Sequence, residues 1–251
     1  LYVINMGATA VGTGLNADPE YIEKVTQYVA DFSGFPMKGA TNLVDATQNT
    51  DVYMEVSSAL KVSMLNMSKV ANDLRLMSSG PRCGFGEINL PPRQPGSSIM
   101  PGKVNPVMAE VMNQSAFQVA GNDLTISMAC EAGQFELNVM EPVIIYNLLQ
   151  SIKIMTNVYN VFRQYCISGI TANKEKMESY VNNSVGIITA INPHVGYETA
   201  SSIAKEAIET GRPVREIVLE RNILTEEELD TILHPIEMTK PGIPGKELLK
   251  N

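Results

Sequence analysis

Apolar and small side chains recur at steps of three or four residues between Asp51 and Ser79. This spacing places them on one stripe of a helix, because an α-helix completes a turn in about 3.6 residues. Gly80 and Pro81 follow, a pair that is typical of a helix end. The pattern predicts one long helix, whose stripe consists of Val52, Val56, Ala59, Ser63, Met67, Val70, Leu74 and Met77.

Two further helical patterns follow, one from Pro106 to about Cys130 and one from Pro142 to about Tyr165. Pro142 suits the first turn of a helix, where the missing N–H is not needed. At about 1.5 Å per residue, each of the three helices is roughly 35–40 Å long. The stripe predicted for the third helix consists of Ile145, Leu148, Leu149, Ile152, Met155, Val158 and Phe162.

Some of these helices carry apolar residues on more than one face, as the run Val143, Ile144 and Ile145 shows. Helices of this length need neighbours along their whole surface. We therefore predict an all-α fold, a long-helix bundle that other subunits extend. A bundle complete within one chain is the alternative, and it would leave apolar faces uncovered.

The pattern changes near Gly169, after which the helical segments become shorter and more polar. We predict a central helical bundle over residues 1–168 and a small C-terminal helical domain over residues 169–251. Within the second domain, Thr225 and Glu228 fit a capping box, and the tail from Met238 is expected to fray. Its helices are expected at about residues 174–182, 196–210, 213–220 and 226–233.

The 251 residues carry 19 basic and 27 acidic side chains, for a formal net charge of −8. An acidic chain is a poor non-specific partner for nucleic acid or an anionic membrane surface, and no run of apolar residues is long enough to span a bilayer. The first six residues show neither an initiator Met nor a signal-peptide layout, and we expect them to lie within a longer protein.

Cysteine and histidine are sparse. The three cysteines, Cys83, Cys130 and Cys166, are far apart and form no CxxC motif, so we expect free thiols in a reducing cytoplasm. The two histidines, His194 and His234, share no metal-ligand spacing. The sequence therefore predicts no structural metal.

The segment from Gly12 to Ala17 matches the dinucleotide-binding pattern G-x-G-x-x-G/A, and Asp31 follows at a suitable distance. Strands and helices do not alternate along the rest of the chain, so no parallel sheet is expected to hold such a loop. We favour the alternative that these small residues let helix termini approach closely.

A proline-rich segment, residues 90–95, leads into a polar loop that ends at Pro106. Loops between rigid helices are a usual location for functional residues. The ammonium of Lys103 and the amide of Asn105 suit a carboxylate, and a serine alkoxide stabilised nearby could act as a base. A solvated surface loop remains the alternative on spacing alone. The loop reads Gly96-Ser97-Ser98-Ile99-Met100-Pro101-Gly102-Lys103-Val104-Asn105.

This loop matches, position for position, the signature G-S-x-x-M-x-x-K-x-N of the aspartase/fumarase superfamily. The resemblance extends over essentially the whole chain, and it implies the long-helix bundle of that superfamily followed by a small C-terminal helical domain. Other segments that resemble the superfamily are residues 7–16, 137–142, 168–174, 182–187 and 192–193.

Segments near the loop resemble aspartate ammonia-lyases more than class II fumarases: residues 74–82, 87–91, 111–114 and 133–142. The resemblance implies a lyase that converts L-aspartate to fumarate and ammonia through an aci-carboxylate intermediate, with no cofactor. A class II fumarase, which interconverts malate and fumarate, is the alternative.

By position in the motif, the resemblance makes Ser97 the base that removes the substrate proton. Ser98, with the loop amides of Ile99 and Met100, would contact a substrate carboxylate. The other candidates are Lys103 and Asn105, which would hold carboxylate charge, and Glu110, which could orient Lys103 or merely complement the helix dipole. His194 and His234 match no catalytic position and are expected to be structural or surface residues.

The resemblance further implies a cytoplasmic homotetramer whose active sites combine segments from three subunits. The other site segments, including a histidine-bearing one, would precede Leu1. We therefore expect this chain to be inactive alone, and a folded but inactive oligomerisation core is the non-enzymatic alternative.

Overall fold

The computed structural model describes residues 1–80, 82–96, 99–100 and 102–249. The chain forms two compact units, unit 1 (Leu1–Thr171) and unit 2 (Ala172–Asn251). The division falls after Thr171, whereas the sequence analysis placed it after residue 168. No helix in the described ranges combines the length and the apolar character that crossing a membrane requires.

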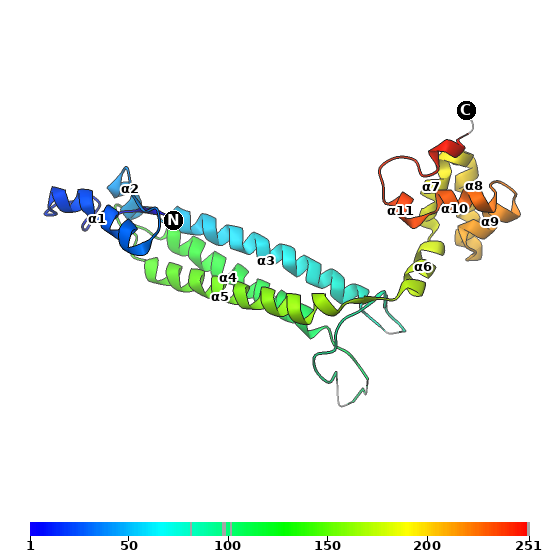
Figure 1. Ribbon diagram of the computed structural model, residues 1–251, viewed down its shortest axis with the longest axis horizontal. Helices are drawn as coiled ribbons and strands as arrows, with labels where there is room; N and C mark the ends of the chain where they lie inside the picture. The colour runs from blue at the N-terminus through cyan, green and yellow to red at the C-terminus, as the bar shows by residue number, and fades with distance from the viewer. Residues whose placement is uncertain (81, 97–98, 101, 250–251) are drawn as a thin grey trace. The chain divides into compact units, whose positions relative to one another are not determined.

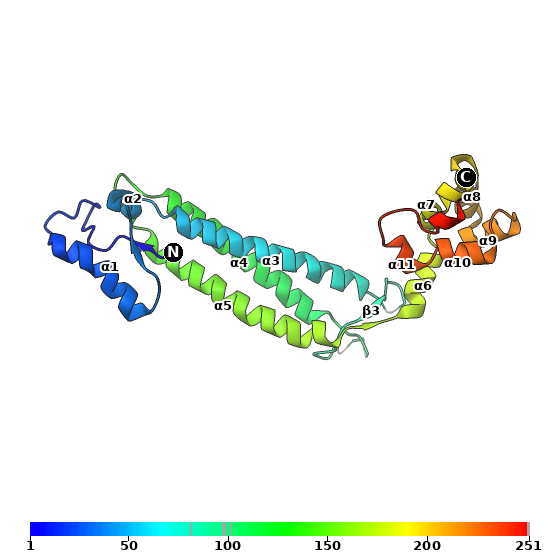
Figure 2. The same cartoon turned by 45° about the horizontal axis from the view of Figure 1, so that its top comes forward.

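The largest elements of unit 1 are three long helices: α3 (Asp51–Met77), α4 (Val107–Glu131) and α5 (Glu141–Tyr165). They run side by side in Figures 1 and 2, and α4 packs against both of the others. The short helix η1 (Ile167–Gly169) follows α5. The two-residue strand β3 (Ile88–Asn89) pairs with β4 (Thr171–Ala172). The predicted all-α fold with long helices is confirmed.

The buried face of α3 differs from the predicted stripe. Val52, Ala59 and Val70 are exposed, and Leu74 is the one stripe residue that is buried. The distance between packed helices depends on the side chains at their contact, and α3 turns mainly small residues toward its neighbours. The residues buried on α3 are Ser57, Met64, Ser68, Ala71 and Leu74.

The predicted stripe of α5 is correct for the part of the helix that follows Ile152. Met155, Val158 and Phe162 are buried, as is Leu148. The remaining predicted residues are exposed on the surface of this chain: Ile145, Leu149 and Ile152. Periodicity identified the apolar positions without showing which of them this chain itself covers.

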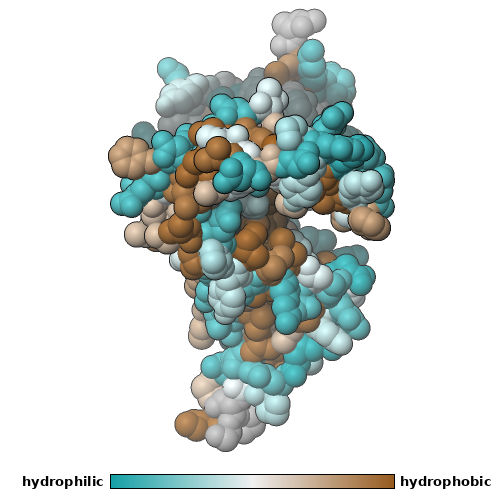
Figure 3. Space-filling view, turned by 90° about the vertical axis from the view of Figure 1, so that its left-hand side faces the viewer, coloured by the Kyte–Doolittle hydropathy of each residue, from teal (hydrophilic) through white to brown (hydrophobic). Residues whose placement is uncertain are grey.

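The N-terminal part of unit 1 holds two short helices and a small parallel sheet. Strand β1 (Val3–Ile4) pairs with β2 (Lys38–Gly39); helix α1 (Pro19–Ser33) lies between them in sequence, and α2 (Leu43–Gln48) follows. Figure 3 views this end of the unit and shows hydrophobic surface among hydrophilic side chains. Exposed aromatic residues of this region include Phe32 and Phe35.

The G-x-G segment makes a close backbone approach to α2. Gly12 has a φ of +85°, and a Cβ placed on it would lie 2.3 Å from the Cα of Val44, in the first turn of α2. A side chain at position 12 would therefore clash with the backbone of α2. The strands described in this chain have two residues each, so the segment is not part of a dinucleotide-binding sheet.

Unit 2 is a cluster of short helices around an apolar core. The capping box at Thr225 and Glu228 is present at the start of α10. Helix α7 was not predicted, and Pro193 lies inside it. The elements are α6 (Lys174–Asn182), η2 (Val185–Ile187), α7 (Ile188–Val195), α8 (Tyr197–Thr210), α9 (Val214–Glu220), α10 (Glu226–Ile232), α11 (Pro235–Met238) and η3 (Lys246–Leu248).

The expectation that the tail frays is wrong as far as Leu248. Leu248 packs against the apolar core of unit 2. His194 Nε2 lies 2.8 Å from the carbonyl oxygen of Pro244. These contacts hold the tail on its unit, because they join it to α7 and to the core.

Candidate active-site loop

The segment that enters the loop after β3 is the first of the loop's two limbs, and it is bound to the end of α5. Arg93 Nε donates a hydrogen bond of 2.8 Å to the carbonyl oxygen of Tyr165, and its guanidinium carbon lies 5.0 Å from the centre of the Tyr165 ring. Pro91 packs against Gly169 so closely that a Cβ there would lie 2.5 Å from the proline Cγ. The proline-rich segment is therefore a fixed support for the loop.

The two limbs of the loop meet at a neck formed by Gly96, Lys103 and Asn105. Asn105 Nδ2 donates a hydrogen bond of 2.9 Å to the carbonyl oxygen of Gly96. A Cβ placed on Gly96 would lie 1.8 Å from the carbonyl oxygen of Lys103. No side chain fits at position 96 while this contact exists, so the glycine is required for the limbs to meet.

Beyond the neck, the described candidate residues are open to solvent. The side chain of Ile99 is 88% exposed and that of Met100 is 51% exposed. The Lys103 amide donates to the carbonyl oxygen of Met100 at 3.2 Å, which forms a turn, and Gly102 has a φ of +82°. The predicted base, Ser97, and its neighbour Ser98 lie outside the described residues.

Lys103 and Glu110 are separated along the chain by the start of α4. Lys103 is exposed and Glu110 is half-buried in the first turn of the helix. Among the ion pairs of the described residues, none joins the two side chains. Lys103 and Asn105 thus both lie at the neck, whereas Glu110 lies beyond it in the first turn of α4.

Sequence reasoning missed two residues that support the loop, Arg93 and Asn113. Arg93 stands in a segment with three prolines. A long basic side chain in such a segment is a signal that the segment is bound to a neighbouring element, here to Tyr165 of α5. Asn113 is a buried amide in the otherwise apolar and small seam between α3 and α4. Its signal is the polar residue on a face that should be apolar.

A buried thiol lies near the anchored limb. Cys166 is 1% exposed at the end of α5. Burial raises the pKa of this thiol, and the positive charge of Arg93 opposes the change. The thiol therefore stays protonated over the neutral pH range.

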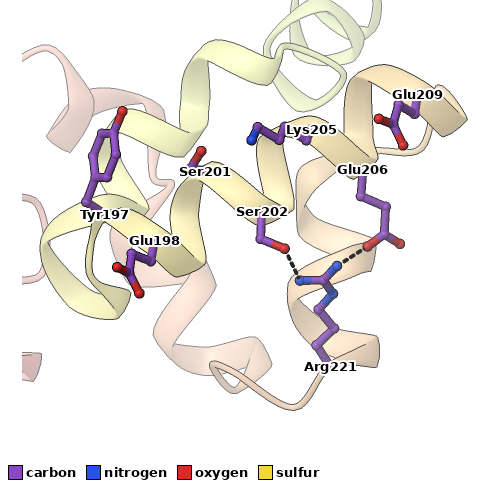
Figure 4. Close-up of a pocket in the computed structure, with 8 residues that line it drawn as sticks. All are labelled: Tyr197, Glu198, Ser201, Ser202, Lys205, Glu206, Glu209 and Arg221. Carbon is purple, nitrogen blue, oxygen red and sulfur yellow. Dashed lines mark hydrogen bonds and ion pairs between the residues drawn. The ribbon is translucent and has the colours of Figure 1, made fainter.

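Unit 2 contains a polar hollow along one face of α8 (Figure 4), with a volume of about 620 Å³. Arg221 spans it, donating to Ser202 Oγ at 3.0 Å and pairing with Glu206. The loop residues do not line this hollow. Where the structure describes the chain, it contains no group of three or more His, Cys, Asp or Glu side chains that could hold a metal ion.

Two family models match the chain: one described as Lyase over residues 1–121, and one described as Fumarase C C-terminus over residues 187–240. The aspartate ammonia-lyase of Bacillus subtilis is 68% identical over 250 residues, covering 100% of this chain and 53% of that protein. The aspartate ammonia-lyase of Corynebacterium glutamicum is 49% identical over 251 residues, covering 100% of this chain and 48% of that protein. The chain thus spans about half the length of the curated relatives it matches.

Solved structures show the same fold. The fumarate lyase:delta crystallin from Brucella melitensis bound to cobalt superposes with a TM-score of 0.91 at 43% identity, covering 96% of this chain and 52% of that one. The class II fumarase from Schistosoma mansoni superposes with a TM-score of 0.88 at 34% identity, covering 96% of this chain and 53% of that one.

Proposed function

Because this chain belongs to the aspartase/fumarase superfamily of lyases, we propose that it forms part of an enzyme that deaminates L-aspartate to fumarate and ammonia. The observation that carries the proposal is the 68% identity to an aspartate ammonia-lyase along the whole chain. The class II fumarase structure has 34% identity. The difference favours aspartate over malate as the substrate.

The proposed chemistry begins with proton removal from the carbon next to the β-carboxylate of aspartate. Negative charge then moves onto that carboxylate as an aci-carboxylate, and its stabilisation is the main catalytic requirement. In this proposal Ser97 is the base. Lys103 provides positive charge to the carboxylate and Asn105 fixes its orientation; no organic cofactor takes part.

The remaining loop residues complete the proposed carboxylate site. Ser98 and the backbone amides of Ile99 and Met100 donate hydrogen bonds to a substrate carboxylate. Glu110 orients the side chain of Lys103. The exposure of Ile99 and Lys103 supports this assignment, since groups that bind a substrate must be reachable from solvent before binding.

We propose that the chain works within a cytoplasmic homotetramer. Large apolar side chains on all three long helices support the assembly, because contiguous apolar surface marks protein interfaces. The three cysteines are free thiols, as is usual in a reducing compartment. The most exposed of the apolar residues on these helices are Leu76, Phe117, Leu124, Met128, Tyr146 and Leu149.

The test extends this chain at Leu1 with the N-terminal portion of the Bacillus subtilis relative and follows fumarate absorbance. The extended protein is expected to release fumarate from L-aspartate, and the unextended chain is expected to be inactive. Turnover of L-malate without turnover of L-aspartate would establish the fumarase alternative. Turnover of neither substrate by a folded tetramer would favour the oligomerisation core.

Ser97→Ala in the extended protein tests the base. A general base contributes about 10²–10⁴-fold to a rate, so kcat is expected to fall by that factor while the melting temperature stays the same. Ser98→Ala is the matched control and is expected to raise KM more than it lowers kcat. An unchanged kcat for Ser97→Ala would remove this serine as the base.

A further inference from the structure

Asn113 lies in the seam between α3 and α4, and its side-chain amide joins three groups of α3. It is 4% exposed. Its Nδ2 donates to the carbonyl oxygen of Ser68 at 3.0 Å and to Ser68 Oγ at 2.8 Å. Its Oδ1 accepts from Arg75 Nη1 at 3.1 Å. A carboxamide has two N–H donors and one oxygen acceptor, so the whole group is satisfied.

The partners of this amide fix both its orientation and the register of the two helices. A rotated amide would turn its N–H groups toward the Arg75 guanidinium and its oxygen toward the Ser68 carbonyl, and both contacts would be repulsive. Sliding α4 along α3 by one residue, about 1.5 Å, would break these bonds and leave buried polar groups unpaired. The buried residues next to Asn113 on α4 are apolar and specify no such register: Ala109, Met112 and Ala116. The next polar contact between α4 and α3, from Asp123 to Ser58 and Lys61, lies farther along the helix from the loop.

The packing of α4 on α3 supports the candidate loop. Helix α4 begins at Val107, directly after the loop, and Asn113 lies about two turns along it. The returning limb enters α4 through Asn105, which also holds the other limb by its hydrogen bond to Gly96. Both limbs at the neck are therefore joined to the start of α4, and Asn113 makes the buried polar contact between α4 and α3 that lies nearest to the loop among the described residues.

We propose that Asn113 is a positioning residue for the reaction: it holds the start of α4 in the register that places Lys103 and Asn105 for catalysis. This inference rests on the proposed function of the loop. Asn113 itself touches no substrate and acts through the helix. Misplacing reacting groups by about 1 Å can lower a rate about 10²-fold, so a change of register should reduce turnover.

The test compares Asn113→Leu with Asn122→Leu in the extended protein. Asn122 is a matched control on the same helix, farther from the loop: it is 2% exposed, and its amide donates to Gln150 Oε1 at 2.9 Å and to Ser151 Oγ at 3.0 Å on α5. Both variants should lower the melting temperature. Below both transitions, Asn113→Leu is expected to lower kcat about tenfold or more, with KM within about threefold, and Asn122→Leu to keep kcat within about twofold. Equal kcat values in the two variants would overturn the proposal.

If Asn113→Leu does not fold, Arg75→Ala replaces it, because Arg75 is exposed and supplies one of the three bonds. Its kcat is expected to fall about threefold relative to Lys69→Ala, an exposed control on the same helix. No difference between these two variants would contradict the positioning role.

Trypsin cleavage after Lys103 separates this inference from the proposed function, because it needs no catalysis. Cleavage is expected to be several-fold faster in Asn113→Leu, or in Arg75→Ala where that variant replaces it, than in the wild type and in Asn122→Leu. Equal cleavage rates would overturn the positioning role. Absence of wild-type turnover on L-aspartate would instead overturn the proposed function and leave the cleavage comparison to decide on Asn113.

Discussion

The two units of this chain bury different kinds of side chain. The core of unit 2 consists of isoleucine, valine, leucine and alanine residues, among them Ile191, Ile217 and Leu229. The polar residues that are buried as a whole in the described ranges belong to unit 1, and they include Asn113, Asn122 and Asp123. In unit 2, two partly exposed residues, Asn192 and His194, each bury one side-chain atom without a partner. Most large exposed apolar side chains also belong to unit 1. Unit 1 therefore has polar pairs inside and apolar residues outside, whereas unit 2 has the usual arrangement.

This difference shows which unit is complete within the chain. Unit 2 removes its own apolar side chains from water, which is the main favourable contribution to folding. Unit 1 joins α3, α4 and α5 through buried hydrogen bonds and leaves apolar helix faces exposed on the surface of this chain. The contrast supports the proposed tetramer, and it predicts that the two units respond differently to the same kind of substitution.

The largest effect is expected for Ile217→Ala in the core of unit 2. Ile217 is fully buried, and removing such a side chain costs about 2–5 kcal/mol through lost burial and a new cavity. Thermal unfolding monitored by circular dichroism measures the loss. Ile208→Ala on the exposed face of α8 is the control and should change stability by less than about 0.5 kcal/mol. Similar losses in the two variants would refute a self-contained core.

The next effect is expected for the ion pair between Lys61 and Asp123 in unit 1. Asp123 is 4% exposed at its side chain and Lys61 is 33% exposed. Lys61→Met leaves a buried carboxylate without its partner, at a cost of about 3 kcal/mol, and replacing both residues with apolar ones should restore most of the stability. Chemical denaturation measures both. Lys69→Met, which breaks the exposed pair with Asp73, should cost at most about 0.5 kcal/mol. If the double variant is no more stable than Lys61→Met, the ion pair contributes to stability by more than neutralising the buried charge of Asp123.

A smaller effect is expected at the start of α10. Thr225 Oγ1 accepts from the Glu228 amide at 3.2 Å, and the Glu228 carboxylate accepts from the Thr225 amide at 2.7 Å. Thr225→Ala removes the cap and should destabilise unit 2 by about 1 kcal/mol, whereas Thr225→Ser should retain it. Thermal melts compare the two variants, and equal melting temperatures would show that the cap is dispensable.

The smallest effect concerns pH and the thiol of Cys166. Its pKa is raised mainly by burial, so the folded state binds this proton more tightly than the unfolded state does. The resulting stabilisation is complete below the unfolded pKa and is lost as the pH rises through the folded pKa. Cys166→Ala should therefore reduce the loss of stability at alkaline pH. At neutral pH a maleimide should label exposed Cys83 well before Cys166; equal labelling rates would contradict the burial of Cys166.

Local sequence patterns predicted most of the helices. The observed bounds of α6 and α5 lie at or next to the predicted ones, because helical periodicity is a local property. The buried face of α3 could not be predicted in the same way, since Val52 and Val70 carry the apolar pattern while Ser57 and Ser68 are buried. Which face is covered depends on the neighbouring elements, which the local pattern does not contain. Helix α7 was not among the predicted helices; it contains Pro193 and buries Ile191.

The motif predicted the candidate loop, but the sequence did not predict the contacts that support the loop. Spacing along the sequence shows that Lys103 and Asn105 are close in the chain, but it does not show that Asn105 bonds back to Gly96. The same limit applies to Asn113 and Ser68, which are 45 residues apart in sequence. Such contacts arise from the packing of α3 on α4 and have no local signal.

The neck at Gly96 has a consequence for exchanging parts between enzymes. A hydrogen bond and a backbone contact hold the two limbs together at the neck, and a longer segment between them would add only about 0.6 kcal/mol of closure entropy per doubling in length. We therefore expect the bundle to keep its stability when the segment between positions 96 and 103 is exchanged for that of a related lyase, provided that glycine stays at position 96 and asparagine at position 105.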